Sequence, residues 1–339
     1  MQDLVVLLEK ARDHTRRVAD DLAGEREFGP RLAIVNPPRW EVGHVGWFQE
    51  FWCLRGGSEE RASILPNADA LYNSATVPHA ARWTLPLPSF ADTIAYRDQV
   101  LDQVIRGARE GRADPYFLEL AVRHELMHAE AFHYTRQTLG YPAPQADPKP
   151  LAGNGDVEYP GGVFRLGAAP GDGFAFDNEK WSHPLALEPF RMARRPVTYG
   201  EYRKFKEPPY CKDGKLRRFE RWIPIPDDEP VRHVSWHDAN AYCAFAGRRL
   251  PSEAEWECAA LAGLENVGHV WEWTSSAFLP YPGFVRDPYK EYSEPWFATH
   301  KVLRGASFAT PPGVSRPRFR NFYTPERGDM FAGFRTCAP

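Results

Sequence analysis

The chain has 339 residues, of which 43% are hydrophobic and 26% charged. These proportions are those of an ordinary globular protein, and the length favours two domains. The net charge of −3 argues against a general nucleic-acid-binding surface. No apolar run reaches the roughly 18 residues that a membrane helix needs, and no signal-peptide pattern is visible. We therefore expect a cytoplasmic protein that binds neither nucleic acid nor membrane.

Helical periodicity dominates residues 1–145. Apolar stripes predict helices near 4–22, 38–52 and 89–105, the second of them entered through a Pro-Pro pair. A fourth helix has a clear start, with Asp114 as N-cap and Pro115 as its first residue, and it ends at Gly140. Four amphipathic helices in this length predict a bundle, whose core is a common place for a metal site.

The pattern changes after a proline-rich linker at 141–150. Residues 146–339 show short strands, glycine and proline turns, and only two helix patterns, at 198–205 and 236–246. The stretch from 258 to 270 is short for the connection from a helix to a loop that it must make. The five cysteines are odd in number and form no CxxC pair, so we predict free thiols in a reducing compartment. The chain is thus expected to be α+β, with domains at 1–145 and 146–339.

Three histidines form a candidate metal site. His124 and His128 are four residues apart in the predicted fourth helix, so they lie on one face of it. His44, in the second helix, would complete a face of three nitrogens around one ion. Such a face leaves coordination positions open, as a catalytic site requires. We expect Glu125 and Glu130 to support the site rather than to bind the metal.

Two alternatives belong to other classes of protein. The HELMH sequence at 124–128 matches the motif of zinc hydrolases, in which Glu125 would be the general base. No third ligand in the usual context follows that helix, which argues against this interpretation. In a binding module without catalysis, the histidines would be structural.

Longer motifs carry a resemblance to known families. The pairing of PPRWEVGH (37–44) with HELMHAE (124–130) resembles the N-terminal DinB-like bundle of the ergothioneine sulfoxide synthase family. The second half resembles the formylglycine-generating-enzyme, or sulfatase-modifying-factor, domain, which has a C-type-lectin-like fold. Its motifs are PGGVFRLG (160–167), RPVTYGEY (195–202), RLPSEAEW (249–256), VWEWTSS (270–276), VLRGAS (302–307) and FAGFR (331–335).

The resemblance implies an oxidative function. Formylglycine-generating enzymes need a cysteine pair near the C-terminus, but only Cys337 is present here, so conversion of cysteine to formylglycine is not expected. The synthases instead bind non-haem Fe(II) through three histidines, matching those above. They use O2 as co-substrate to join a chalcogen donor to C2 of the imidazole of hercynine, which is trimethylhistidine.

The same resemblance suggests residues for the substrates. Tyr289 or Tyr292 would be the active-site tyrosine, and Asn321 would lie in the hercynine pocket. A trimethylammonium group prefers aromatic faces, for which Trp271, Phe322 and Tyr323 are candidates, with core packing as the alternative. Because these residues and the metal ligands fall in different predicted domains, we expect the active site to lie between the domains.

The donor site departs from the family pattern. Members that use γ-glutamylcysteine commonly carry Arg-x-x-Arg after the second helix and an acid after the Asn-aromatic pair. Here these places read His79-Ala-Ala-Arg82 and Tyr323. Among basic side chains, only arginine binds a carboxylate through two parallel hydrogen bonds. That mode of binding is lost at the first position, where this chain has His79. The pattern resembles the selenoneine synthase branch, which uses a selenosugar. An ergothioneine sulfoxide synthase acting on γ-glutamylcysteine or cysteine is the alternative.

Overall fold

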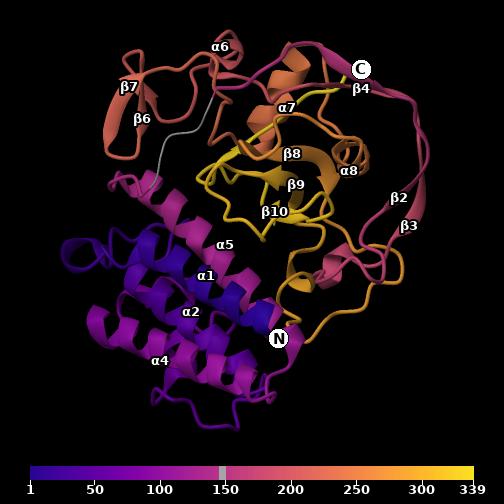
Figure 1. The fold of residues 1–339 in the computed structure, drawn as a ribbon. Coiled ribbons are helices and arrows are strands. Elements are labelled where there is room, and N and C mark those ends of the chain that lie inside the picture. Colours follow the sequence, from indigo (N-terminus) through magenta and orange to yellow (C-terminus); the bar gives the residue numbers. More distant parts are fainter. Residues whose placement is uncertain (145–149) are drawn as a thin grey trace. The chain divides into compact units, whose positions relative to one another are not determined.

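A computed structural model describes residues 1–144 and 150–339, so part of the predicted linker at 141–150 lies outside the described residues. The chain divides into two compact units. Unit 1 comprises Met1–Pro144 with Pro311–Val314, and unit 2 comprises Gln145–Thr310 with Ser315–Pro339. The units have different architectures, one helical and one mixed (Figure 1).

Unit 1 is built on four long helices, as the periodicity predicts (Figure 1). They are α1 (Gln2–Ala19), α2 (Pro38–Cys53), α4 (Phe90–Arg109) and α5 (Pro115–Leu139). Helix α2 packs against α4 and α5, and α1 packs against α5. The predicted caps of α5 are confirmed, because the Asp114 carboxylate accepts from the Tyr116 amide at 2.8 Å and Gly140 is left-handed, with φ 69°. Short helical segments complete the unit: η1 (Gly24–Arg26), α3 (Ala68–Tyr72) and η2 (His79–Trp83).

Two glycines in α2 allow its neighbours to approach closely. A Cβ on Gly43 would lie 2.2 Å from Cε1 of Tyr72, and one on Gly46 would lie 3.0 Å from the backbone of Arg97 in α4. Side chains at these positions would push α3 and α4 away from α2. The spacing of the glycines around His44 therefore brings the backbone of Tyr72 close to this histidine.

The described residues of unit 2, from 150 onward, contain short strands in four small sheets. The largest has the order β10-β9-β8-β11, formed by Asn321–Tyr323, Lys301–Ala306, Val270–Ala277 and Ala332–Gly333. Helices α7 (Trp236–Phe245) and α8 (Glu253–Leu261) contact β8. The smaller sheets pair β1 (Asp156–Tyr159) with β4 (Phe190–Ala193), β2 (Gly162–Leu166) with β3 (His183–Leu187), and β5 (Cys211–Lys212) with β6 (Lys215–Arg218) and β7 (Arg221–Pro224). The remaining elements are η3 (Asp177–Glu179), α6 (Tyr199–Tyr202) and η4 (Glu294–Trp296).

Two helix predictions in unit 2 need correction. The helix expected at 198–205 is a single turn, α6, and the prediction of only two helices missed α8. Helix α8 escaped the periodicity because it buries charged residues as well as apolar ones. Glu257 is fully buried and accepts from Arg304 at 2.9 Å, so a polar residue occupies the face where the pattern requires an apolar one.

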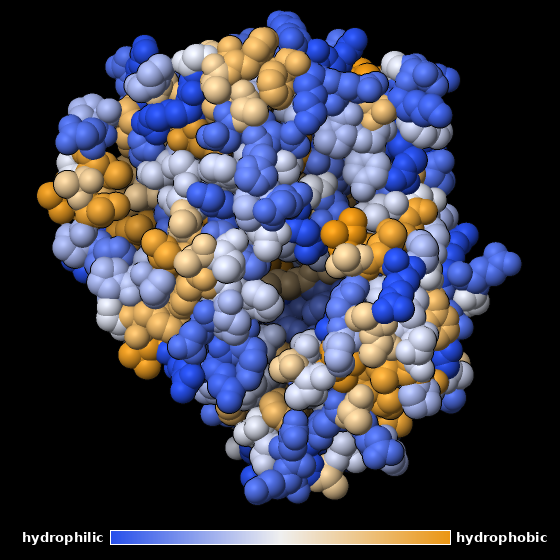
Figure 2. All heavy atoms as spheres, turned by 180° about the vertical axis from the view of Figure 1, so that it is seen from behind, coloured by the Kyte–Doolittle hydropathy of each residue, from blue (hydrophilic) through white to orange (hydrophobic). Residues whose placement is uncertain are grey.

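The surface agrees with the composition. On the face that Figure 2 shows, hydrophobic side chains form small patches among hydrophilic ones. No helix within the described ranges is long and apolar enough to cross a membrane. All five cysteines are free thiols, as their spacing predicts.

Candidate metal centre

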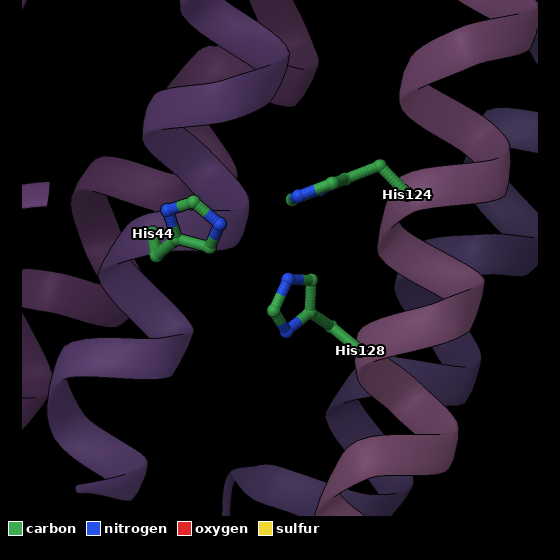
Figure 3. A group of neighbouring side chains, drawn as sticks. All are labelled: His44, His124 and His128. Atoms are coloured by element: carbon green, nitrogen blue, oxygen red, sulfur yellow. The ribbon is translucent and has the colours of Figure 1, made fainter. Parts of the chain in front are cut away.

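The three predicted ligands converge. His44 projects from α2, and His124 and His128 project from successive turns of α5, with the rings pointing toward one another (Figure 3). One ligand atom from each ring lies within 4.8 Å of the other two. His44 and His124 are buried, and His128 is partly exposed. The convergence predicted from the sequence is confirmed.

Hydrogen bonds at the Nδ1 atoms fix the tautomers of two ligands. Nδ1 of His44 lies 2.8 Å from the carbonyl oxygen of Tyr72, and Nδ1 of His128 lies 2.6 Å from Oε1 of Glu41. A carbonyl or a carboxylate can only accept, so each Nδ1 carries the proton. The lone pair of each ring is then on Nε2 and available to a metal ion.

The environment keeps His44 and His124 neutral. Burial lowers the pKa of His44 and of His124 well below the ordinary range of imidazole, and the neighbouring His128 lowers both further. The ring of Phe48 stacks on His124 with 3.5 Å between centroids, which restricts its rotation. Three converging imidazoles are a donor set for a first-row transition metal, so the residues fit the ion that the sequence implies.

Glu125 has a structural role that weakens the zinc-hydrolase alternative. Its carboxylate accepts from Nε of Arg12 at 2.7 Å, and both side chains are buried. Arg12 also donates to Gln49 at 3.1 Å, so a network connects α1, α2 and α5. A carboxylate held in this ion pair is not free to act as a general base. Glu130, the other acid of the motif, is buried as well.

Sequence reasoning missed the support given by Glu41. This residue is 1% exposed and lies three positions before His44 on α2. That spacing places both side chains on the face of α2 that meets α5. The role of Glu41 could therefore have been predicted from its spacing to His44. Tyr72 could not have been found, because it contributes its backbone carbonyl.

His79 and Arg82, the predicted donor-site residues of unit 1, lie in η2. Nε2 of His79 lies 2.8 Å from the carbonyl oxygen of Val35. The guanidinium of Arg82 lies 3.9 Å from the ring centroid of Trp40, which in turn stacks on His44 at 4.9 Å. Arg82 is thus one aromatic ring away from a metal ligand.

Arg82 also retains hydrogen-bonding capacity. It donates to the Asn36 side chain at 2.6 Å, a neutral acceptor, and its Nε has no partner among the described residues. Burial lowers the pKa of Arg82 to about 10, while Glu41 raises it, so the side chain is charged at neutral pH. The described hydrogen-bond partners of this cation are thus an amide oxygen and the carbonyl oxygen of Val77, and no carboxylate.

Several predicted residues of unit 2 form one aromatic cluster. The ring centroids of Tyr289 and Tyr292 are 5.7 Å apart, and those of Tyr292 and Phe322 are 5.6 Å apart with the rings nearly perpendicular. Phe278 stacks on Phe322 at 4.0 Å. Burial raises the pKa of both tyrosines, so their hydroxyls are protonated at neutral pH and can act as donors.

The other predicted residues of unit 2 are placed as follows. Asn321 begins β10, and its side-chain oxygen accepts from the amide of Phe322 at 2.9 Å. The guanidinium of Arg327 lies 5.1 Å from the ring centroid of Tyr323. Trp271 is 2% exposed and its ring lies 5.8 Å from that of Phe319, which is what the core-packing alternative describes.

Comparison with known proteins matches both halves of the chain. The DinB superfamily matches residues 7–132, and the sulfatase-modifying factor enzyme 1-like domain matches 142–267 and 262–338. Over its full length the chain is 32% identical to a hercynine oxygenase of Mycolicibacterium smegmatis, with 97% of this chain and 96% of the relative covered. The chain belongs to the hercynine oxygenase family. Its fold is accordingly a helical DinB domain followed by a loop-rich, mixed domain of the sulfatase-modifying-factor type.

Other relatives define the relationship further. The hercynine oxygenase of Mycobacterium tuberculosis is 31% identical, with 98% of each chain covered. A formylglycine-generating enzyme of Streptomyces coelicolor is 32% identical but covers only 58% of this chain. The second-domain match is in two parts that meet at 262–267, between the end of α8 and the start of β8, where the sequence looked compressed. The connection between α8 and β8 in this chain therefore differs from that of the sulfatase-modifying factor enzyme 1-like domain in general.

Proposed function

We propose that this protein is a non-haem Fe(II)- and O2-dependent synthase that forms a carbon–chalcogen bond at C2 of hercynine. The observation that carries the proposal is the convergence of His44, His124 and His128 in a chain related over its full length to hercynine oxygenases. Those relatives are named for hercynine, so small-molecule substrates are proposed here too.

In this proposal, His44, His124 and His128 would hold the iron, with Nε2 the available atom of His44 and His128. The bound metal would supply open coordination positions that bring the chalcogen donor and O2 together. Side chains and backbone groups of the protein orient the ligands, donate a proton or hydrogen atom, and bind the substrate. Glu41 and the Tyr72 carbonyl keep both Nδ1 protons in place, and Tyr289 or Tyr292 donates a proton or hydrogen atom from its hydroxyl. Phe322 and its neighbours present aromatic faces to the trimethylammonium group, and Asn321 binds hercynine.

The electron balance explains why O2 is needed. Joining C2 of the imidazole to the donor removes one hydrogen from each partner, which is a two-electron oxidation. Transfer of one oxygen atom to the chalcogen is a second two-electron oxidation. O2 accepts these four electrons, so that one of its atoms leaves as water and the other remains in the product.

We further propose that the donor is a selenosugar. A γ-glutamylcysteine donor carries two carboxylates and an ammonium group, and His79 and Tyr323 stand where an arginine and an acid would bind them. Of these two residues in unit 1, Arg82 offers a guanidinium, while the described contacts of His79 include a backbone carbonyl. Loss of two charge-assisted contacts, each about 1.5–3 kcal/mol, would weaken use of the dipeptide by roughly a hundredfold or more.

A metal and donor experiment tests this proposal. The protein is loaded anaerobically with Fe(II) or with Zn(II), then exposed to air with hercynine and a mixture of a 1-selenosugar and γ-glutamylcysteine. We expect product only with iron and mainly from the selenosugar. A higher kcat/KM for γ-glutamylcysteine would identify an ordinary ergothioneine sulfoxide synthase. A parallel Zn(II) sample is kept free of O2, and turnover in that sample would support a hydrolase.

A further inference from the structure

A short turn in unit 2 contacts both segments to which the proposed function assigns substrate and catalytic residues. It consists of Phe176, Asp177, Asn178, Glu179 and Lys180 and is called the 176–180 turn below; η3 lies within it. Three of its side chains are buried to 1% or less: Asp177, Asn178 and Glu179. No motif singled out in the sequence includes it.

One set of contacts reaches the loop that carries the tyrosines. The hydroxyl of Ser293 donates to Asp177 at 2.5 Å and accepts from the Asn178 amide at 2.9 Å. At the other end of the loop, Nζ of Lys180 lies 2.7 Å from an oxygen of Asp287. Tyr289 and Tyr292 lie between these two attachment points. The loop is therefore fixed on both sides of the pair.

The turn also contacts one tyrosine directly. The ring of Phe176 stacks on that of Tyr292, with 4.1 Å between centroids and 20° between planes. Stacking of this kind restricts the tilt of the Tyr292 ring, while the hydrogen bonds restrict the backbone. Together they define where the hydroxyl of Tyr292 points within unit 2.

A second set of contacts reaches the segment before β10. Arg320 is fully buried and donates to the carbonyl oxygen of Asn178 at 2.7 Å. It also holds Glu253 through two bonds of 2.8 and 2.9 Å and directly precedes Asn321. Glu179 accepts from Arg316 at 2.8 and 2.9 Å. The turn thus fixes the approach to the residues predicted to bind hercynine.

We propose that the 176–180 turn is a positioning element. It holds the loop at 287–293, which carries both tyrosines, in a fixed position relative to the Asn321–Phe322 segment. The inference rests on the proposed function for its chemical meaning. Every residue of the turn contacts the loop at 287–293, the segment at 316–320, or both, and these two segments are more than 20 positions apart in sequence. The role proposed for Asp177 and its neighbours is exerted through the residues that they hold.

The test compares substitutions in the turn contacts with a matched control. Ser293→Ala removes the hydroxyl shared by Asp177 and Asn178, and Lys180→Met removes the largely buried ion pair at the other end of the loop. Thr198→Ala is the control, since it removes a buried hydroxyl that caps α6 and contacts neither segment. Asp177→Asn keeps an acceptor for Ser293 and should restore most of what Asp177→Ala loses.

Two readouts separate positioning from simple stability. The first is the ratio of C2-bonded product to oxidised donor, measured with hercynine and a 1-selenosugar or γ-glutamylcysteine well below the melting temperature. We expect Ser293→Ala and Lys180→Met to lower it by roughly tenfold to a hundredfold, and Thr198→Ala to leave it unchanged. Wild-type ratios in both folded turn variants would overturn the inference.

The second readout needs no turnover. Hydrogen–deuterium exchange should rise in 287–293 and in 320–323 together in Ser293→Ala, and in neither segment in Thr198→Ala. Unchanged exchange in both segments of Ser293→Ala would also overturn the inference. A wild-type enzyme that forms no bond to hercynine would instead contradict the proposed function, while the exchange result would still decide the role of the turn.

Discussion

At the scale of single residues, Glu41 is the side chain of the proposed metal centre that the sequence did not reveal. Its carboxylate orients the ring of His128 through Nδ1. Carboxylates in this position typically contribute roughly 10–100-fold to metal affinity. We expect Glu41→Gln to weaken Fe(II) binding by about that factor, as measured anaerobically by competition with a chromophoric chelator. Glu60→Gln, an exposed acid of unit 1, is the control, and equal affinities of the two variants would contradict this role.

The tyrosine hydroxyl is the second residue-scale prediction. If Tyr289 donates to the reacting oxygen, Tyr289→Phe should lower the rate of bond formation by about a hundredfold or more, or divert turnover to oxidation of the donor. Tyr292→Phe, measured alongside, distinguishes the two candidates of the cluster. Product analysis by mass spectrometry gives both rates. Unchanged turnover and product ratio in both variants would remove the tyrosines from the mechanism.

At the scale of elements, the glycines of α2 are predicted to set the packing of the bundle. In Gly43→Ala the new methyl would overlap the ring of Tyr72, and overpacking of this kind costs about 1–3 kcal/mol. Gly107→Ala in α4 is the matched control, because a Cβ there meets nothing within 4 Å and should stabilise by roughly 0.5–1 kcal/mol. Urea unfolding measures both. Equal effects at the two positions would show that close approach to α2 is unimportant.

The same scale shows how far the sequence could predict this structure. The four long helices followed from their apolar stripes, and the ends of α5 followed from Asp114, Pro115 and Gly140. Helix α8 did not, because Glu257 and Arg304 bury charges where periodicity expects apolar residues. The convergence of the three histidines was predictable in part, since the spacing of His124 and His128 places them on one helix face. The 176–180 turn was not, because its partners are distant in sequence and joined only by the fold.

At the scale of the whole molecule, buried histidines predict how stability depends on pH. Burial, with Arg232 nearby, lowers the pKa of His233 in unit 2 to about 3, and burial lowers that of His133 in unit 1 to about 3. Above pH 6.5 both are neutral in the folded and unfolded chain. Between pH 6.5 and 3 only the unfolded chain takes up these protons, so the free energy of unfolding falls as the pH falls.

The expected size is testable with one substitution. Lowering the pH from 7.5 to 5.0 should reduce the free energy of unfolding by about 2 kcal/mol for each such histidine. The reduction is about 1.4 kcal/mol for each pH unit below 6.5. His233→Asn, which suits the positive φ of this residue, should remove that loss from unit 2. Urea unfolding at the two pH values measures it, with the exposed His237→Asn as control. An unaltered pH dependence in His233→Asn would mean that this histidine is not buried in its neutral form.

The central claim is that the chain breaks the C2–H bond of hercynine and forms a carbon–chalcogen bond there. Hercynine deuterated at C2 tests it most directly, in air with the Fe(II)-loaded protein and a 1-selenosugar. We predict a product that has lost the deuterium and gained the donor, in amounts that depend on O2 and disappear in His124→Ala. Hercynine recovered with its deuterium intact, while neither this donor nor γ-glutamylcysteine is incorporated, would contradict the account.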